Sequence, residues 1–135
     1  MCGDIDDDTS LDDELLARLM AHAKRYDAVV SDRTTGSKIG YSGEAARSQY
    51  MSALFRDGLS QALSDAAAAP DGARTDAIAC QAIVFARLAG FLAGHIPPGA
   101  DMFRTVVDAM MDGHKEPSEH TEQHHHDHHA HGHDH

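Results

Sequence analysis

Residues 77–96 read AIACQAIVFARLAGFLAGHI, and this stretch decides the fold class. It is apolar nearly all round, and it lies between Pro70-Asp71-Gly72 and Pro97-Pro98-Gly99. Proline lacks a backbone donor and cannot continue a helix, so these two clusters mark the limits of one element. The sequence therefore predicts a long helix over about 73–96, either central in a bundle or at an oligomer interface.

Small residues recur along this stretch at spacings of three and four. They are Ala79, Ala82, Ala86, Ala89, Gly90, Ala93 and Gly94. A stripe of small side chains lets two helix backbones approach closely, so residues 79–94 are a candidate homodimer face. The length also suits a membrane span, but Arg87 near its middle makes insertion costly by roughly 2.5–3.5 kcal/mol. We therefore expect no membrane partner.

Two further long helices are predicted on the N-terminal side. One covers about 11–30, where Ser10 and Asp13 resemble a capping box. The other covers about 42–68, with apolar residues along one face and Pro70 beyond its end. The polar stretch 31–40 between them predicts a loop, with a hairpin as the alternative.

A shorter fourth helix is predicted over about 100–112, because Gly113 is a common residue just after a helix end. The fold class is therefore all-α: a small up-down bundle of three long helices and one shorter helix. No large apolar side chain follows Gly113, so we expect residues 113–135 to form a disordered tail. Residues 1–9 are acidic and also expected to be disordered, which leaves 10–112 as the α-helical domain.

The charge balance excludes several partner classes. The chain has 22 acidic and 11 basic residues and a formal net charge of −11. Such a chain does not offset phosphate repulsion, so no nucleic-acid partner is expected. Two cysteines, Cys2 and Cys80, do not make a disulfide framework, and the acidic N-terminus is unlike a secretory signal. A cytoplasmic location is predicted.

The C-terminal stretch carries the strongest chemical signal. Residues 124–135 read HHHDHHAHGHDH, and histidines begin to gather further upstream. Imidazole suits nickel, zinc and cobalt, and closely spaced rings on one segment can reach one ion. The predicted metal ligands are His114, His120, His124, His125, His126, His128, His129, His131, His133 and His135.

The alternatives for this stretch are a purification tag and a solvated tail without a role. Tags are usually uninterrupted histidine runs, whereas Asp127, Ala130, Gly132 and Asp134 interrupt this one. If the segment becomes helical, His124 and His128 share a face, as do other pairs spaced by four. Histidine-rich termini of this composition resemble those of nickel-maturation and of zinc or cobalt chaperones. That resemblance covers the tail alone.

Other candidate sites are weaker. The acids from Asp4 onward echo a calcium-binding loop, but Thr9 and Leu15 stand where that loop needs glycine and glutamate. The TTGSKIG stretch at 34–40 lacks the spacing of a phosphate-binding loop. Met110, Met111 and His114 are spaced like a soft-metal entry, although such a stripe is more often core packing.

The sequence favours a transition-metal binding protein that captures, stores or delivers nickel, zinc or cobalt through its histidine-rich tail. Catalytic motifs are absent from the sequence, so we do not expect an enzyme. The alternative is a small helical interaction module, with a client protein or a second copy as partner and the tail as an accessory.

Overall fold

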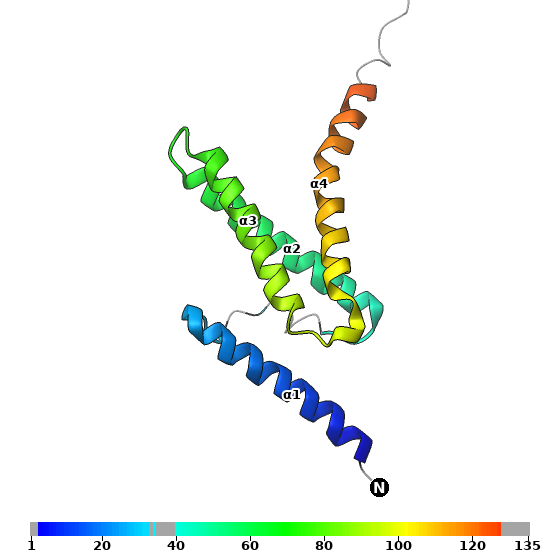
Figure 1. Ribbon diagram of the computed structural model, residues 1–135. Helices are drawn as coiled ribbons and strands as arrows, with labels where there is room; N and C mark the ends of the chain where they lie inside the picture. Colours follow the sequence, from blue (N-terminus) through cyan, green and yellow to red (C-terminus); the bar gives the residue numbers. More distant parts are fainter. Residues whose placement is uncertain (1–2, 33, 35–39, 128–135) are drawn as a thin grey trace, which may run out of the picture. The chain divides into compact units, whose positions relative to one another are not determined.

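The computed structural model consists of α-helices, which confirms the all-α fold class (Figure 1). It describes residues 3–32, 34 and 40–127, and the side chains of these residues except in 3–10 and 120–127. No β-strand occurs within those ranges. The elements in order are α1 (Gly3–Ala23), the 3-10 helix η1 (Lys24–Tyr26), α2 (Gly43–Ala68), α3 (Arg74–Ala93), the 3-10 helix η3 (Pro98–Ala100) and α4 (Met102–Asp127).

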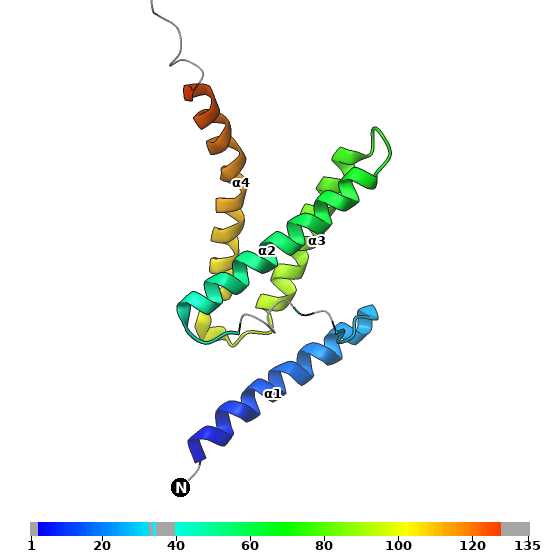
Figure 2. The ribbon, with the colours of Figure 1, turned by 180° about the vertical axis from the view of Figure 1, so that it is seen from behind.

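The chain divides into two compact units, residues 1–87 and 88–135, with the boundary inside α3. The first unit contains α1, η1, α2 and most of α3. The second contains the last residues of α3, then η3 and α4 (Figure 2).

Helix α1 begins earlier than the sequence predicted. It starts at Gly3, so placing residues 1–9 in a disordered segment and the helix start near residue 11 was wrong for residues 3–9. Aspartates fill this part of the sequence, and negative charge near a helix N-terminus complements the helix dipole. Beyond η1, Asp27 adopts a left-handed conformation with φ of 57°. Aspartate tolerates that conformation better than most residues, which explains the end of the helix there.

A tight turn connects α2 to α3 at the predicted break. The N–H of Ala73 donates to the carbonyl oxygen of Pro70 at 3.0 Å. Gly72 has a φ of 91°, which glycine adopts without a steric penalty. Arg74 adds an exposed ion pair with Asp71 at 3.3 Å. The turn reverses the chain, so α2 and α3 form an antiparallel hairpin (Figure 1).

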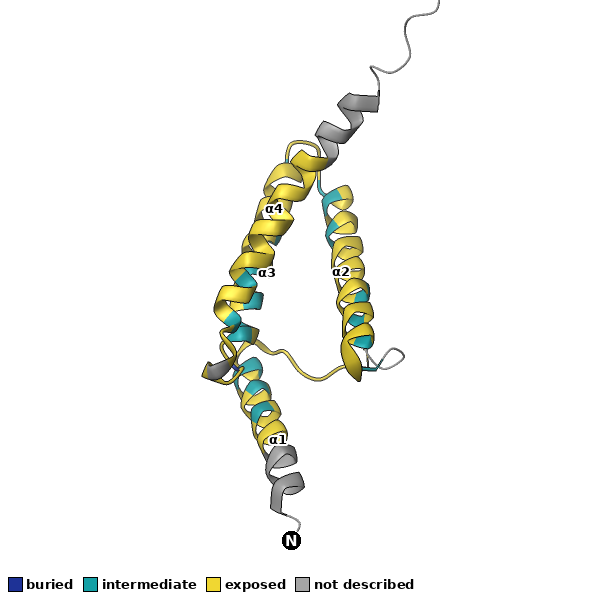
Figure 3. Ribbon diagram, turned by 90° about the vertical axis from the view of Figure 1, so that its right-hand side faces the viewer, coloured by how far each residue is buried: buried dark blue, intermediate teal, exposed yellow. Residues whose placement is uncertain are grey.

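Small side chains close this hairpin beside the turn. The half-buried residues there are Ala62, Ala66 and Ala69 of α2, and Ala73, Ala77 and Gln81 of α3. The Gln81 side chain donates from Nε2 to the carbonyl oxygen of Ala62 at 3.2 Å, which ties the two helices together. Further from the turn α2 and α3 diverge (Figure 3). The hairpin is therefore closed at one end by alanines.

The described residues bury no hydrophobic side chain. The sequence predicted that each amphipathic helix would place a face in a common core, and that packing is not found within either unit. Most half-buried positions of α2 and α3 are alanines, whereas larger side chains such as Met51 and Phe55 on α2 are 69% and 67% exposed. Alanine contributes little apolar area, so the contacts of the hairpin alone give weak hydrophobic stabilisation.

Helix α4 extends well beyond the predicted stop. It was expected to be short and to end at Asp112, but it continues through Gly113 and Pro117 to Asp127. That boundary was therefore wrong, and residues 113–127 of the predicted disordered tail belong to a helix. Glycine inside a helix costs only about 1 kcal/mol relative to alanine, so Gly113 does not force an end. Pro117 is more costly, at about 3 kcal/mol, because it lacks an N–H and its ring crowds the carbonyl of Gly113.

We predict that enlarging a half-buried alanine will open the hairpin. Ala66→Leu should lower the free energy of unfolding by about 1–3 kcal/mol, because the added methyl groups cannot fit between α2 and α3. Urea denaturation followed by far-UV circular dichroism measures this. The matched control is Ala67→Leu, since Ala67 is exposed on the same helix. Equal effects of the two substitutions would contradict the packing described for Ala66.

Candidate metal centre on the C-terminal helix

The predicted metal ligands fall into two groups in the structure. Five lie on α4: His114, which is exposed, and His120, His124, His125 and His126, which are placed by the helix backbone. The other five lie outside the described residues: His128, His129, His131, His133 and His135. Sequence reasoning found all five histidines of α4, but it did not predict the part of the helix that carries them.

Helix geometry selects one pair among these histidines. His120 and His124 are four positions apart and occupy the same face of α4 one turn apart. Positions with this spacing have Cβ atoms about 5–6 Å apart, which lets two imidazoles ligate one ion. His125 and His126 are adjacent in the sequence, so their positions do not share one face of the helix. Within α4, His120 and His124 are the histidines that are separated by one turn.

The charge of α4 favours a cation. Its sequence contains two basic residues, Arg104 and Lys115, and six acidic ones. The acidic residues are Asp108, Asp112, Glu116, Glu119, Glu122 and Asp127. The carbonyls at a helix C-terminus also carry partial negative charge, and His124 lies in the last turn. A divalent ion at this end of α4 is therefore favoured electrostatically.

No group of three or more histidine, cysteine or acidic side chains suited to hold a metal ion occurs among the residues that the structure describes. A metal ion held by the pair on α4 would therefore have two protein ligands from this helix. A zinc or nickel ion needs at least four, so water, residues beyond Asp127 or a partner must supply the others. Such an open site binds metal less tightly than a closed four-ligand site and leaves room for a further ligand.

His95 is the one buried residue in the described part of the chain, at 7% exposure. Its Nδ1 lies 2.7 Å from the carbonyl oxygen of Phe91, and the two rings are 4.8 Å apart. A carbonyl can only accept, so Nδ1 carries the proton and donates it. His95 follows the end of α3 and fixes the chain just before Pro97. These contacts give His95 a structural role at the end of α3.

The other predicted candidates are not assembled into sites. Residues 4–15 lie within α1, so they do not form the calcium-binding loop that their acids echo. Cys80 is an exposed free cysteine on α3. Met110 and Met111 are 51% and 53% exposed, so they are not packed as core residues within their unit. Most of the glycine- and serine-containing stretch at 34–40 lies outside the described residues.

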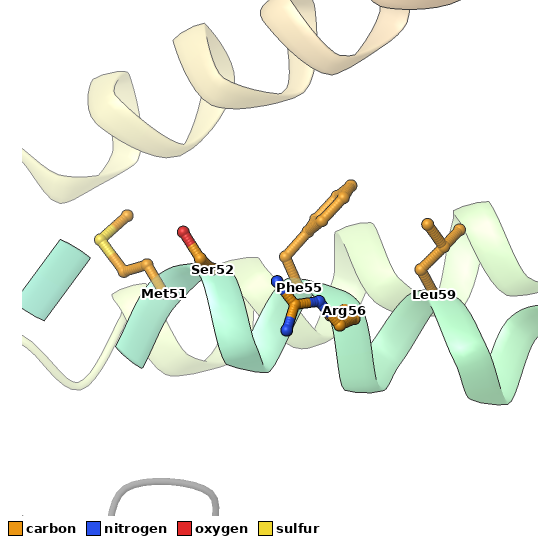
Figure 4. Close-up of a pocket in the computed structure, with 5 residues that line it drawn as sticks. All are labelled: Met51, Ser52, Phe55, Arg56 and Leu59. Atoms are coloured by element: carbon orange, nitrogen blue, oxygen red, sulfur yellow. The ribbon is translucent and has the colours of Figure 1, made fainter. Parts of the chain in front are cut away.

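The sequence reasoning missed a surface depression on α2 (Figure 4). It has a volume of about 460 Å³ and is lined by Met51, Ser52, Phe55, Arg56 and Leu59. These residues recur at spacings of three and four, which was the signal available in the sequence. Phe55 and Met51 were assigned to a buried face instead. The depression is open and mostly apolar, which suits a side chain of a partner better than a small polar ligand.

Helix α3 is long and apolar enough to cross a membrane by length and composition. Arg87 lies inside this apolar window and has a partner from η1. Its guanidinium donates to the hydroxyl of Tyr26 at 3.4 Å and lies 5.6 Å from the centre of that ring. The contact joins η1 to α3 within the first unit.

Comparison with known proteins adds no identification. Family models, curated proteins and solved structures give no match to this chain.

We predict that His95 stabilises the chain without contributing to metal binding. His95→Ala removes the bond to Phe91 and the ring contact, so the free energy of unfolding should fall by about 1–2 kcal/mol. Thermal denaturation measures the loss, and His114→Ala is the control because His114 is exposed. Nickel titration of the His95→Ala chain should match that of the unchanged chain. A loss of nickel affinity would assign His95 to the metal site instead.

Proposed function

We propose that this protein binds a divalent transition metal ion, nickel, zinc or cobalt, through its C-terminal histidines. The observation that carries the proposal is the pair His120 and His124 on one face of α4, inside a segment that holds ten histidines from His114 onward. Neutral imidazole is the common form of histidine near pH 7 and is the form that ligates these metals.

The arrangement suits capture and transfer more than permanent retention. Two imidazoles one turn apart hold an ion while leaving coordination positions open. The neighbouring histidines raise the local concentration of ligands, so an ion released from one pair is recaptured by another. Storage or delivery of the metal in the cytoplasm, without catalysis, is the role that this chemistry supports.

Replacing the ten histidines with glutamine tests the proposal directly. Glutamine keeps helix propensity and polarity but is a much poorer ligand for these metals, so the α4 segment should remain in place. By isothermal titration calorimetry, the unchanged chain should bind nickel or zinc more tightly than micromolar. The substituted chain should bind at least about a hundredfold more weakly, since its imidazole ligands are gone.

The control for this experiment is His22→Gln, because His22 lies on α1, outside the proposed site. Its nickel affinity should equal that of the unchanged chain. Affinity no better than micromolar in the unchanged chain, or affinity that survives replacement of all ten residues, would rule out the metal function.

A second function is favoured by a separate observation: the apolar side chains exposed on α2. Met51, Leu54, Phe55, Leu59 and Leu63 are each at least 48% exposed. When a partner covers a side chain of this size, roughly 60–120 Å² of its surface is removed from water. The five side chains together then supply about half of the ~800 Å² that each partner of a stable dimer contributes. We propose a second copy of the chain as the partner, with the small-residue stretch 79–94 adding to the contact.

We predict that this association depends on Phe55. Analytical ultracentrifugation of the unchanged chain in buffer without detergent should show a dimer. Phe55→Arg should raise its dissociation constant about thirtyfold, because loss of a central aromatic anchor costs about 2 kcal/mol. Ser60→Arg is the control, since it adds the same charge on the opposite side of α2. A monomer at all concentrations would reject the interaction module, and a chain that stays in solution only with detergent would indicate a membrane instead.

A further inference from the structure

The part of α4 that leads to the histidine pair lies on the surface. Residues 111–119 are all exposed, and no large apolar side chain follows Met111 in the sequence. The helical residues beyond Pro117 number only ten, from Ser118 to Asp127. Isolated helices shorter than about 12–15 residues are marginal in water even with favourable composition. Burial therefore does not account for the helix over residues 111–119, which lead to the histidine pair.

Two residues weaken α4 just before the histidine pair. Gly113 and Pro117 are four positions apart, so Pro117 offers no N–H to the carbonyl of Gly113. A Cβ added at Gly113 would meet no atom within 4 Å, so packing does not require glycine there. The two weakest helix formers of the helix thus lie together, in the turn that separates its apolar first half from its histidine-rich end. Helix α4 is therefore weakest between Gly113 and Pro117.

We propose that a metal ion bridging His120 and His124 holds α4 helical beyond Pro117. The proposal rests on the metal function above and adds a conformational consequence to it. An ion that ligates both imidazoles is bound well only when the two positions lie one helical turn apart. The ion therefore binds the helical state more tightly than the non-helical state. A ligand with such a difference in affinity shifts the equilibrium toward the state that it prefers.

The same linkage predicts the effect of Pro117 on affinity. If only a fraction of molecules has the helical pair, the apparent dissociation constant rises in inverse proportion to that fraction. Removing the proline raises the helical fraction, so metal should bind more tightly although no ligand has changed. A site formed by a structureless tail has no such dependence on Pro117.

The experiment uses the full chain with glutamine at positions 128, 129, 131, 133 and 135, which leaves the histidines of α4. Nickel alone is titrated, with circular dichroism at 222 nm and calorimetry read in parallel. In this background nickel should increase the helical signal. His120→Gln with His124→Gln should abolish that increase and weaken binding at least about tenfold. The matched control, His125→Gln with His126→Gln, removes two histidines but keeps the pair and should retain the increase.

Pro117→Ala supplies the second measurement. It should raise the helical signal before nickel is added and tighten nickel binding about tenfold in the same background, as the shifted population requires. Gly58→Ala is its control, because it strengthens α2 and a Cβ there meets no atom within 4 Å. That variant should leave nickel affinity unchanged.

The outcomes separate this inference from the metal function itself. Nickel binding in this background without a change in helical signal, or with equal affinity before and after Pro117→Ala, overturns the coupling and leaves the metal function standing. An unchanged response after loss of His120 and His124 overturns the assignment of the pair. Absence of nickel binding in the unmodified full chain overturns both.

Discussion

Hydrogen bonding within single helices is the interaction on which the described structure depends. Each helix satisfies most of its backbone donors and acceptors internally, and no hydrophobic side chain is buried in the ranges that the structure describes. Helix position is therefore governed by local signals: the turn at Pro70 to Ala73, the double proline after His95, and the left-handed residues Asp27 and Asp101. Long-range contacts are few and specific, as between Gln81 and Ala62 or between Arg87 and Tyr26.

Because local signals govern the positions of the helices, small residues are half-buried in one part of the chain and exposed in another. Near the α2–α3 turn, alanines allow two helices to approach, and the half-buried positions of Ala66 and Ala77 follow from it. Gly90 in the same α3 is exposed, and a Cβ there would meet no atom within 4 Å. Only part of the small-residue stretch 79–94 is thus half-buried in the single chain. The exposed part, with the large side chains of α2, is available to a partner.

The sequence predicted the centres of the helices better than their ends. The α2 helix was predicted almost to the residue, because Ser42 and Pro70 bound an uninterrupted apolar period. The ends of α1 and α4 were misjudged because composition was taken as a sign of disorder. Acids at a helix N-terminus, and glutamates and a lysine after Gly113, are in fact compatible with helix. Packing was less predictable, since an apolar stripe shows that a face needs covering but not what covers it.

The candidate site was half predictable for the same reason. Ligand chemistry can be read from residue type, so the ten histidines were found without a structure. Which of them act together depends on backbone conformation, and the helical backbone up to Asp127 singles out His120 and His124. A structureless tail presents its imidazoles in many arrangements and so discriminates poorly between metals. A helical pair holds two ring positions one turn apart, which imposes a geometry on the ion and leaves its remaining positions open. Under the proposed metal function, this combination would keep the ion bound yet accessible to the ligands of an acceptor.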